Sequence, residues 1–149
     1  MLLNNFRKFL AGYAAKGLNF KITDTTGNEV TTHISTSYSI IENVIFPRIG
    51  SGTTEPTAND YALENAINMS SVGITVTTER VFENNVLTIT RTFTNTSSNT
   101  FYVGEAATIV GDAVTAAGIE IALTRDLIDV DLAPSETLTI TWTFNFNEV

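Results

Sequence analysis

The chain has 149 residues, which fits one domain, and it contains no cysteine and a single histidine, so thiolate and multi-histidine metal sites are excluded. The 16 acidic and 8 basic residues give a net charge of −8. This balance argues against a nucleic-acid partner, because proteins that bind nucleic acid need basic surface to displace counterions from phosphate. About one residue in six is threonine, a β-branched residue that suits the half-exposed surface of a strand.

The first predicted element is a short amphipathic helix over residues 2–16, within an N-terminal segment 1–17 that ends at Gly17. Residues 1–22 carry four basic residues and no acid. Two interpretations stay open: the helix caps a β domain, or its apolar stripe docks, together with Arg7 and Lys8, to a partner surface or to copies of the chain. The stripe has three- and four-residue spacing and consists of Leu2, Leu3, Phe6, Phe9, Leu10 and Tyr13.

We expect no membrane partner. The apolar start is interrupted by Asn4, Asn5, Arg7 and Lys8, which is too early for a signal peptide. No window approaches the ~18 apolar residues of a membrane span, and a short stripe with four charges makes a weak interfacial helix.

After residue 17 the apolar period changes to two, which predicts a single β domain over residues 18–149. Strands are expected at 18–22, 38–49, 74–82, 87–94, 101–103, 119–123 and 138–146, with turns at 24–28, 83–85, 95–99 and 133–136. Pro47 confines its strand to an edge or a bend. The last strand alternates most clearly, with a predicted core face of Leu138, Ile140, Trp142, Phe144 and Phe146. Short strands joined by regular turns predict a mainly β fold, an antiparallel β-sandwich.

A Gly/Thr/Pro loop is predicted at residues 50–60, followed by residues 60–63 that pack back onto the body. The Gly50-Ser51-Gly52 run lacks the Lys-Ser/Thr and the helix of a phosphate-binding loop. His33 is the only base available for a Ser-His-Asp triad, and a surface or core histidine is the simpler interpretation. We therefore expect neither enzymatic activity nor a cofactor.

Acidic residues offer two further possibilities. Asp126, Asp129 and Asp131 lie close together near a predicted turn, where they either bind Ca²⁺ or form a solvated turn. Glu105 follows an apolar strand and is expected to be partly buried in a structural ion pair with Arg91 or Arg125.

Three tyrosines are candidate glycan contacts, because exposed aromatic rings can stack on sugars. They are Tyr38, Tyr61 and Tyr102. This interpretation makes the protein an adhesin or a carbohydrate-binding module.

Two runs, 93–103 and 132–142, resemble the "F-T-N-T-G-S … L-A-P-G-E-S" pattern of immunoglobulin-like β-sandwich modules. Ser98 or Asn99 stands where glycine is usual, and Ser135 replaces the glycine that follows proline. The resemblance implies an immunoglobulin-like sandwich, to which the N-terminal helix is added.

A second resemblance concerns residues 49–64, which are similar to the "G-x-G-T-T-x-P-T-x-x-D-Y-x-L" segment of small proteins encoded by tailed bacteriophages and prophages. Residues 3–10 match the "L-x-N-N-F-x-K-x-L" opening of those proteins. The resemblance covers most of the length and is weakest at residues 20–44. It implies a structural component of the virion: a capsid decoration or auxiliary protein, a head-fibre protein or a tail component. Its partners would be other virion proteins and copies of itself.

Overall fold

The computed structural model describes residues 1–14, 19–32, 45–111 and 120–145, and for residues 10–14 the backbone alone. Its elements, in chain order, are α1 (Asn4–Ala14), β1 (Phe20–Thr23), β2 (Glu29–Thr32), β3 (Ile45–Gly50), α3 (Met69–Val72), β4 (Ile74–Glu83), β5 (Val86–Asn95), β6 (Phe101–Val110), β7 (Ile121–Leu132) and β8 (Thr137–Asn145). The described chain is thus mainly β, as predicted from the two-residue period.

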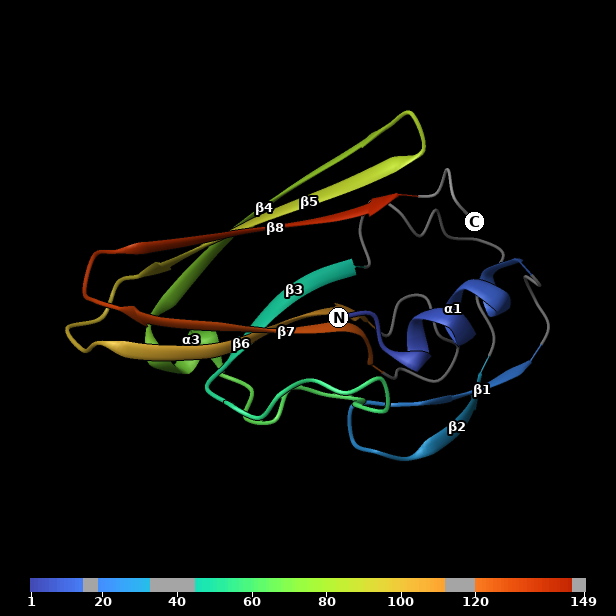
Figure 1. Cartoon of the computed structure of the whole chain (residues 1–149). Helices are drawn as coiled ribbons and strands as arrows, with labels where there is room; N and C mark the ends of the chain where they lie inside the picture. Colours follow the sequence, from blue (N-terminus) through green and yellow to red (C-terminus); the bar gives the residue numbers. More distant parts are fainter. Residues whose placement is uncertain (15–18, 33–44, 112–119, 146–149) are drawn as a thin grey trace.

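Every strand pair among these elements is antiparallel, which confirms that part of the prediction. One sheet has the order β3-β6-β7, a second has the order β4-β5-β8, and β1 pairs with β2 as a separate hairpin. Figure 1 shows the β4-β5-β8 sheet above the β3-β6-β7 sheet, with α1 and the β1–β2 hairpin to one side. The chain crosses between the two sheets after β3, after β5 and after β7.

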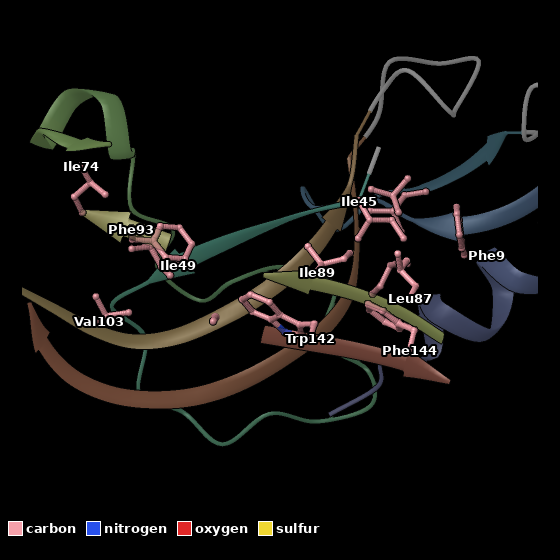
Figure 2. Close-up of a cluster of buried hydrophobic side chains, with 14 of the residues drawn as sticks. Phe9, Ile45, Ile49, Ile74, Leu87, Ile89, Phe93, Val103, Trp142 and Phe144 are labelled. Carbon is pink, nitrogen blue, oxygen red and sulfur yellow. The ribbon is translucent and has the colours of Figure 1, made fainter. Parts of the chain in front are cut away.

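The two sheets bury one common core. Figure 2 shows Ile49 and Ile89, from opposite sheets, among the side chains that fill the space between them. The β3-β6-β7 sheet contributes Ile45, Ile49, Val103, Ala106, Val110, Ile121, Leu123 and Leu132. The β4-β5-β8 sheet contributes Ile74, Leu87, Ile89, Phe93, Trp142 and Phe144. At about 25 cal/mol per Å² of apolar surface removed from water, this core is the main stabilising contribution to the fold.

The outer face of the β4-β5-β8 sheet is a grid of threonines. Strand β5 alternates strictly between buried and half-buried positions, and the register of β4 and β8 places threonine beside threonine across the sheet. The hydroxyls of Thr90 and Thr141 lie 3.2 Å apart, and those of Thr92 and Thr139 lie 3.0 Å apart. The grid consists of Thr75, Thr77, Thr88, Thr90, Thr92, Thr94, Thr137, Thr139, Thr141 and Thr143.

Two arginines connect the sheets at the edge of β3. Pro47 lies in this edge strand, as predicted. Arg80 donates to the Ile45 carbonyl through Nε (3.3 Å) and Nη2 (3.1 Å), and Arg91 donates to the Pro47 carbonyl. Because these carbonyls are occupied and Pro47 has no N–H, this part of the β3 edge has little capacity to pair with another strand.

The N-terminal segment packs onto both sheets. Leu3 N donates to Leu123 O (2.9 Å), so the first residues lie along the free edge of β7. Leu3 and Phe9 are buried, and the Phe6 ring stacks on Phe144 with centroids 5.7 Å apart. Within the described residues, Leu3, Phe6 and Phe9 of the stripe therefore pack on the core of the chain itself, whereas Leu2 is exposed.

The sequence prediction was wrong about residues 126–131. They lie within the 12-residue strand β7 rather than at a turn, because β6 pairs with them as far as Leu132. A left-handed residue, Asp129 with φ of 61°, interrupts the alternation that would have revealed a strand. The one-turn helix α3, which Asn68 caps, was not predicted. Predicted features at Gly17, His33, Tyr38 and Phe146 lie outside the described residues.

Candidate functional site

The most densely connected polar site holds the loop of residues 51–66 against β6 and β7. At its centre is Glu105, a fully buried carboxylate. A register shift between Val103 and Glu105 breaks the β6–β7 ladder, and a bulge of this kind re-aims a side chain. The carboxylate accepts hydrogen bonds from the backbone N–H groups of Gly52 (3.1 Å), Glu64 (3.1 Å) and Asn65 (2.8 Å).

Arg125 on β7 supplies the positive charge of this network. Its Nε donates to Glu105 Oε2 at 2.7 Å, and its Nη1 donates to Asp60 at 2.5 Å. The same guanidinium reaches the Thr54 carbonyl at 3.1 Å and Glu64 at 3.5 Å. Of the two predicted partners for Glu105, Arg125 is therefore the one that binds it, and the pair is fully rather than partly buried.

The G-x-G of the loop is required by the space that Glu105 occupies. A Cβ atom on Gly50 or on Gly52 would overlap Glu105 Oε1. Gly52 must also bring its N–H to the same carboxylate. Only glycine leaves room for this approach of the backbone. Glycine at both positions therefore provides the space that the buried Glu105 carboxylate occupies.

The two other acids of the network are held as anions. Burial raises the pKa of Asp60, but hydrogen bonds from Thr57 and the Arg125 guanidinium outweigh it, and its pKa lies below the ordinary value. Hydrogen bonds from the backbone N–H and hydroxyl of Thr54 lower the pKa of Glu64. Burial lowers the pKa of Arg125, and its bonds to Glu105 and Asp60 raise it to a net value above the ordinary one.

This arrangement is suited to fastening a loop. All three carboxylates accept hydrogen bonds from the loop backbone and bind the same guanidinium. General acid–base work needs a group whose pKa is shifted towards neutrality, whereas Asp60 and Glu64 are shifted away from it. The sequence pointed to Glu105 and Arg125, but it did not reveal that Asp60 and Glu64 belong to the same network. The only available signal was that these two acids lie in the segment that follows the G-x-G motif.

The predicted docking residues fall into two groups. Leu3 and Phe9 are buried and Phe6 is half-buried against the chain's own core, whereas Leu2, Arg7 and Lys8 are exposed. The side chains of Leu10 and Tyr13 lie outside the described residues.

Of the predicted glycan contacts, Tyr61 and Tyr102 lie on different elements, and Tyr38 lies outside the described residues. Tyr61 and Tyr102 are 43% and 38% exposed, so both rings are accessible. Tyr61 lies on the loop beside Asp60, while Tyr102 lies on β6 and donates to Asp129 at 3.3 Å. Burial and the neighbouring Asp129 raise the pKa of Tyr102.

Two of the three aspartates of β7 have separate partners. Asp126 binds the Met1 ammonium, and Asp129 accepts from Tyr102. Among the residues that the structure describes, no three His, Cys, Asp or Glu side chains are grouped to hold a metal ion. Within the same residues, no helix has the length and hydropathy to cross a membrane.

The sequence analysis named Arg91 only as a candidate partner of Glu105 and did not single out Asn95, and both side chains are buried. Arg91 occupies a core position of β5, and burial, followed by the charges of Arg80 and Arg48, lowers its pKa to about 10. Asn95 is fully buried, and its amide donates to the Asn99 and Leu132 carbonyls at 2.7 and 2.9 Å.

Comparisons with protein-family models, with curated proteins and with solved structures find no match to this chain.

Proposed function

We propose that this chain is a non-enzymatic structural component of a bacteriophage virion. The role that fits best is a capsid decoration, auxiliary or head-fibre protein, with other virion proteins and copies of itself as partners. The proposal rests on the structural role of residues 49–64, the segment that resembles phage proteins. Its Gly50 and Gly52 make room for Glu105, and its Asp60 and Glu64 bind Arg125. Because Asp60 and Glu64 are both bound to the loop backbone and to Arg125, this arrangement supports a scaffold rather than a catalyst.

We also infer that the two sheets form an immunoglobulin-like β-sandwich. In a constant-type immunoglobulin domain, strands C and F are neighbours in one sheet, and strands D and E are neighbours in the other. Here β5 neighbours β8 and β6 neighbours β7, so β5 to β8 follow the pairing of C, D, E and F. Strand β4 departs from the pattern, because it lies beside β5 rather than in the opposite sheet.

In this proposal, the exposed side of the N-terminal segment binds the partner protein. Leu2 is 55% exposed, and Arg7 and Lys8 extend into solvent from α1. This basic side contrasts with the rest of the chain, which contains all the acids. An acidic surface on the shell, or on a neighbouring copy, would complement it.

Immunogold electron microscopy of lysate particles, with antiserum to the recombinant protein, tests the proposal. Label on heads is the expected result, and label on tails would assign the chain to the tail instead. If particles stay unlabelled while soluble fractions are positive, the virion role is wrong.

Charge-reversal variants test docking better than a truncation, since removing α1 would expose Phe144 and the core. We expect Arg7→Glu with Lys8→Glu to reduce the binding of recombinant protein to particles. Lys21→Gln removes an exposed charge of the β1–β2 hairpin and is the matched control. Unchanged binding of the double variant would exclude this surface.

A further inference from the structure

A pocket of about 340 Å³ lies between α1, β1 and the 51–66 loop. It brings together two groups of residues that the sequence treated separately: the basic pair Arg7 and Lys8, and the aromatic Tyr61. In Figure 1 the green loop runs towards the β1–β2 hairpin, on the side of the molecule where α1 lies. The volume is in the lower part of the range of small-molecule sites, roughly 300–1,000 Å³.

The walls of the pocket are tied to one another. Asn4 N donates to the Ala58 carbonyl at 2.8 Å, and its side-chain amide donates to Asn59 Oδ1 at 2.9 Å, which fixes α1 to the loop. The buried Asn5 exchanges hydrogen bonds with Thr23, at 2.7 and 3.3 Å, which fixes α1 to β1. A site that is formed before its ligand arrives avoids the entropic cost of ordering.

The aromatic ring is also held in place. Tyr61 packs over the turn between β1 and β2, so closely that a Cβ on Gly27 would lie 2.9 Å from Tyr61 Cζ. The ring is nevertheless 43% exposed. A fixed ring that keeps an open part is suited to stacking against a flat apolar face of a ligand.

The charge of the pocket favours an anion. Within the described part of the chain, neither Arg7 nor Lys8 forms an ion pair, and both are exposed. The one carboxylate in the lining, Asp60, is bound by Thr57 and by the Arg125 guanidinium. The nearby Glu29 forms its ion pair with Lys21 at 2.7 Å, and the charge of Lys8 also helps to lower its pKa. Because neither Arg7 nor Lys8 is bound in an ion pair with a described residue, both can meet a ligand.

We propose that this pocket binds an acidic sugar, a pyranose that carries a carboxylate. The sugar ring stacks on Tyr61, its carboxylate binds Arg7 and Lys8, and its hydroxyls bond with the side-chain amides of Asn4 and Asn59. Arginine suits a carboxylate because its planar fork donates two parallel hydrogen bonds. The inference goes beyond the virion role and does not depend on it, since it concerns the isolated chain.

The test is calorimetric or NMR titration of the purified full chain at low salt with three probes. Methyl glucuronide is the expected ligand, with a Kd of roughly millimolar for a single sugar unit. Methyl glucoside has the same ring without the carboxylate, and acetate has the carboxylate without the ring. We expect each to bind at least about tenfold more weakly. Acetate binding as tightly as the glucuronide, or no glucuronide binding at tens of millimolar, would overturn the proposal.

Variants locate the site. Tyr61→Ala and Arg7→Gln with Lys8→Gln are each expected to weaken glucuronide binding about tenfold, whereas Tyr61→Phe keeps the ring and binds normally. Tyr102→Ala removes a tyrosine of similar exposure outside the pocket and is the matched control. Urea unfolding of each variant checks that it is folded. Glucuronide binding that survives Tyr61→Ala, or that is lost equally in Tyr102→Ala, would show that the ligand is not held in this pocket.

Discussion

Arg125 Nε lies 2.7 Å from Glu105 Oε2, and both side chains are almost completely removed from solvent. The pair stands on neighbouring strands, and Glu105 binds loop residues that come 40 to 53 residues before it in the chain. A buried pair of this kind contributes little net free energy compared with a well-packed apolar pair, but breaking it by removing one partner is costly. Its role here is to fix one conformation of the 51–66 loop.

Removing one partner is therefore the first prediction. We expect Glu105→Gln to lower the free energy of unfolding by about 3–5 kcal/mol, because Arg125 is left with a buried, partly uncompensated charge. Urea unfolding followed by circular dichroism measures the change. The double variant Glu105→Leu with Arg125→Met is expected to be more stable than Glu105→Gln, since no buried charge remains on either strand. If the double variant is the less stable of the two, the loop N–H groups that lose the Glu105 carboxylate cost more than the unpaired charge of Arg125.

The resemblance to immunoglobulin-like modules places Ser135, and either Ser98 or Asn99, where those modules carry glycine; we expect substitutions of the two serines by glycine to have opposite effects. Ser135 has φ of 68°, a left-handed conformation that costs a non-glycine residue about 1 kcal/mol, so Ser135→Gly is expected to raise stability by about that amount. Ser98 is not among the described residues with positive φ. Ser98→Gly should instead lose about 0.4–1 kcal/mol by adding freedom to the unfolded chain. Thermal unfolding of both variants distinguishes them; an equal response would mean that φ does not decide the effect.

We expect low pH to destabilise the protein by weakening the contacts of the 51–66 loop. Asp60 and Glu64 have folded-state pKa values below their ordinary values of 3.8 and 4.5. The stability that they contribute is present above those ordinary values and is lost as the pH falls through the lower folded-state values. We expect the urea midpoint to hold from about pH 7 to pH 5 and to fall below about pH 4.

The variant Asp60→Asn should flatten that acid dependence, because one of the two groups no longer titrates. Asp131→Asn, which removes an exposed acid of β7, should leave it unchanged. Equal slopes for wild type and Asp60→Asn would show that the acid response arises elsewhere.

Adjacent residues of β5 test the two faces of its sheet. Ile89 is fully buried, and Ile89→Ala is expected to cost about 2–5 kcal/mol through lost burial and the cavity that remains. Thr90 lies in the threonine grid, and Thr90→Ala should change stability by no more than about 0.5 kcal/mol. Chemical unfolding of the two variants gives the comparison. A large loss for Thr90→Ala would mean that the cross-strand hydroxyl pair with Thr141 matters more than exposure suggests.

The regular strands could be predicted from sequence because one physical effect determines them. In β5 and β8, apolar residues alternate with threonine, and burial of one face suffices to assign both strand and orientation. Arg91 broke the pattern without breaking the strand. Its long side chain leaves the core position and reaches the Pro47 carbonyl of the other sheet, a contact 44 residues away that no local pattern reports.

The polar site was less accessible for the same reason. Glu105 and Arg125 stood out as charges beside apolar strands, but Asp60 and Glu64 are ordinary loop acids until tertiary contacts bring them to Arg125. The pocket beside Tyr61 is a still more distant relationship. It requires α1, β1 and the loop to meet. Tertiary contacts bring these segments together, and no local sequence pattern reports such contacts.

The order of strand pairing also has a consequence in time. Strand β3 pairs with β6, β5 pairs with β8, and Leu3 bonds to Leu123. During synthesis, the first residues leave the ribosome long before any of these partners exist, and the β4–β5 hairpin waits for β8. Long-range pairings of this kind slow folding and leave strands exposed meanwhile. The hydrogen bonds from Arg80 and Arg91 cannot protect the edge of β3 during that interval, because both arginines are synthesised after it.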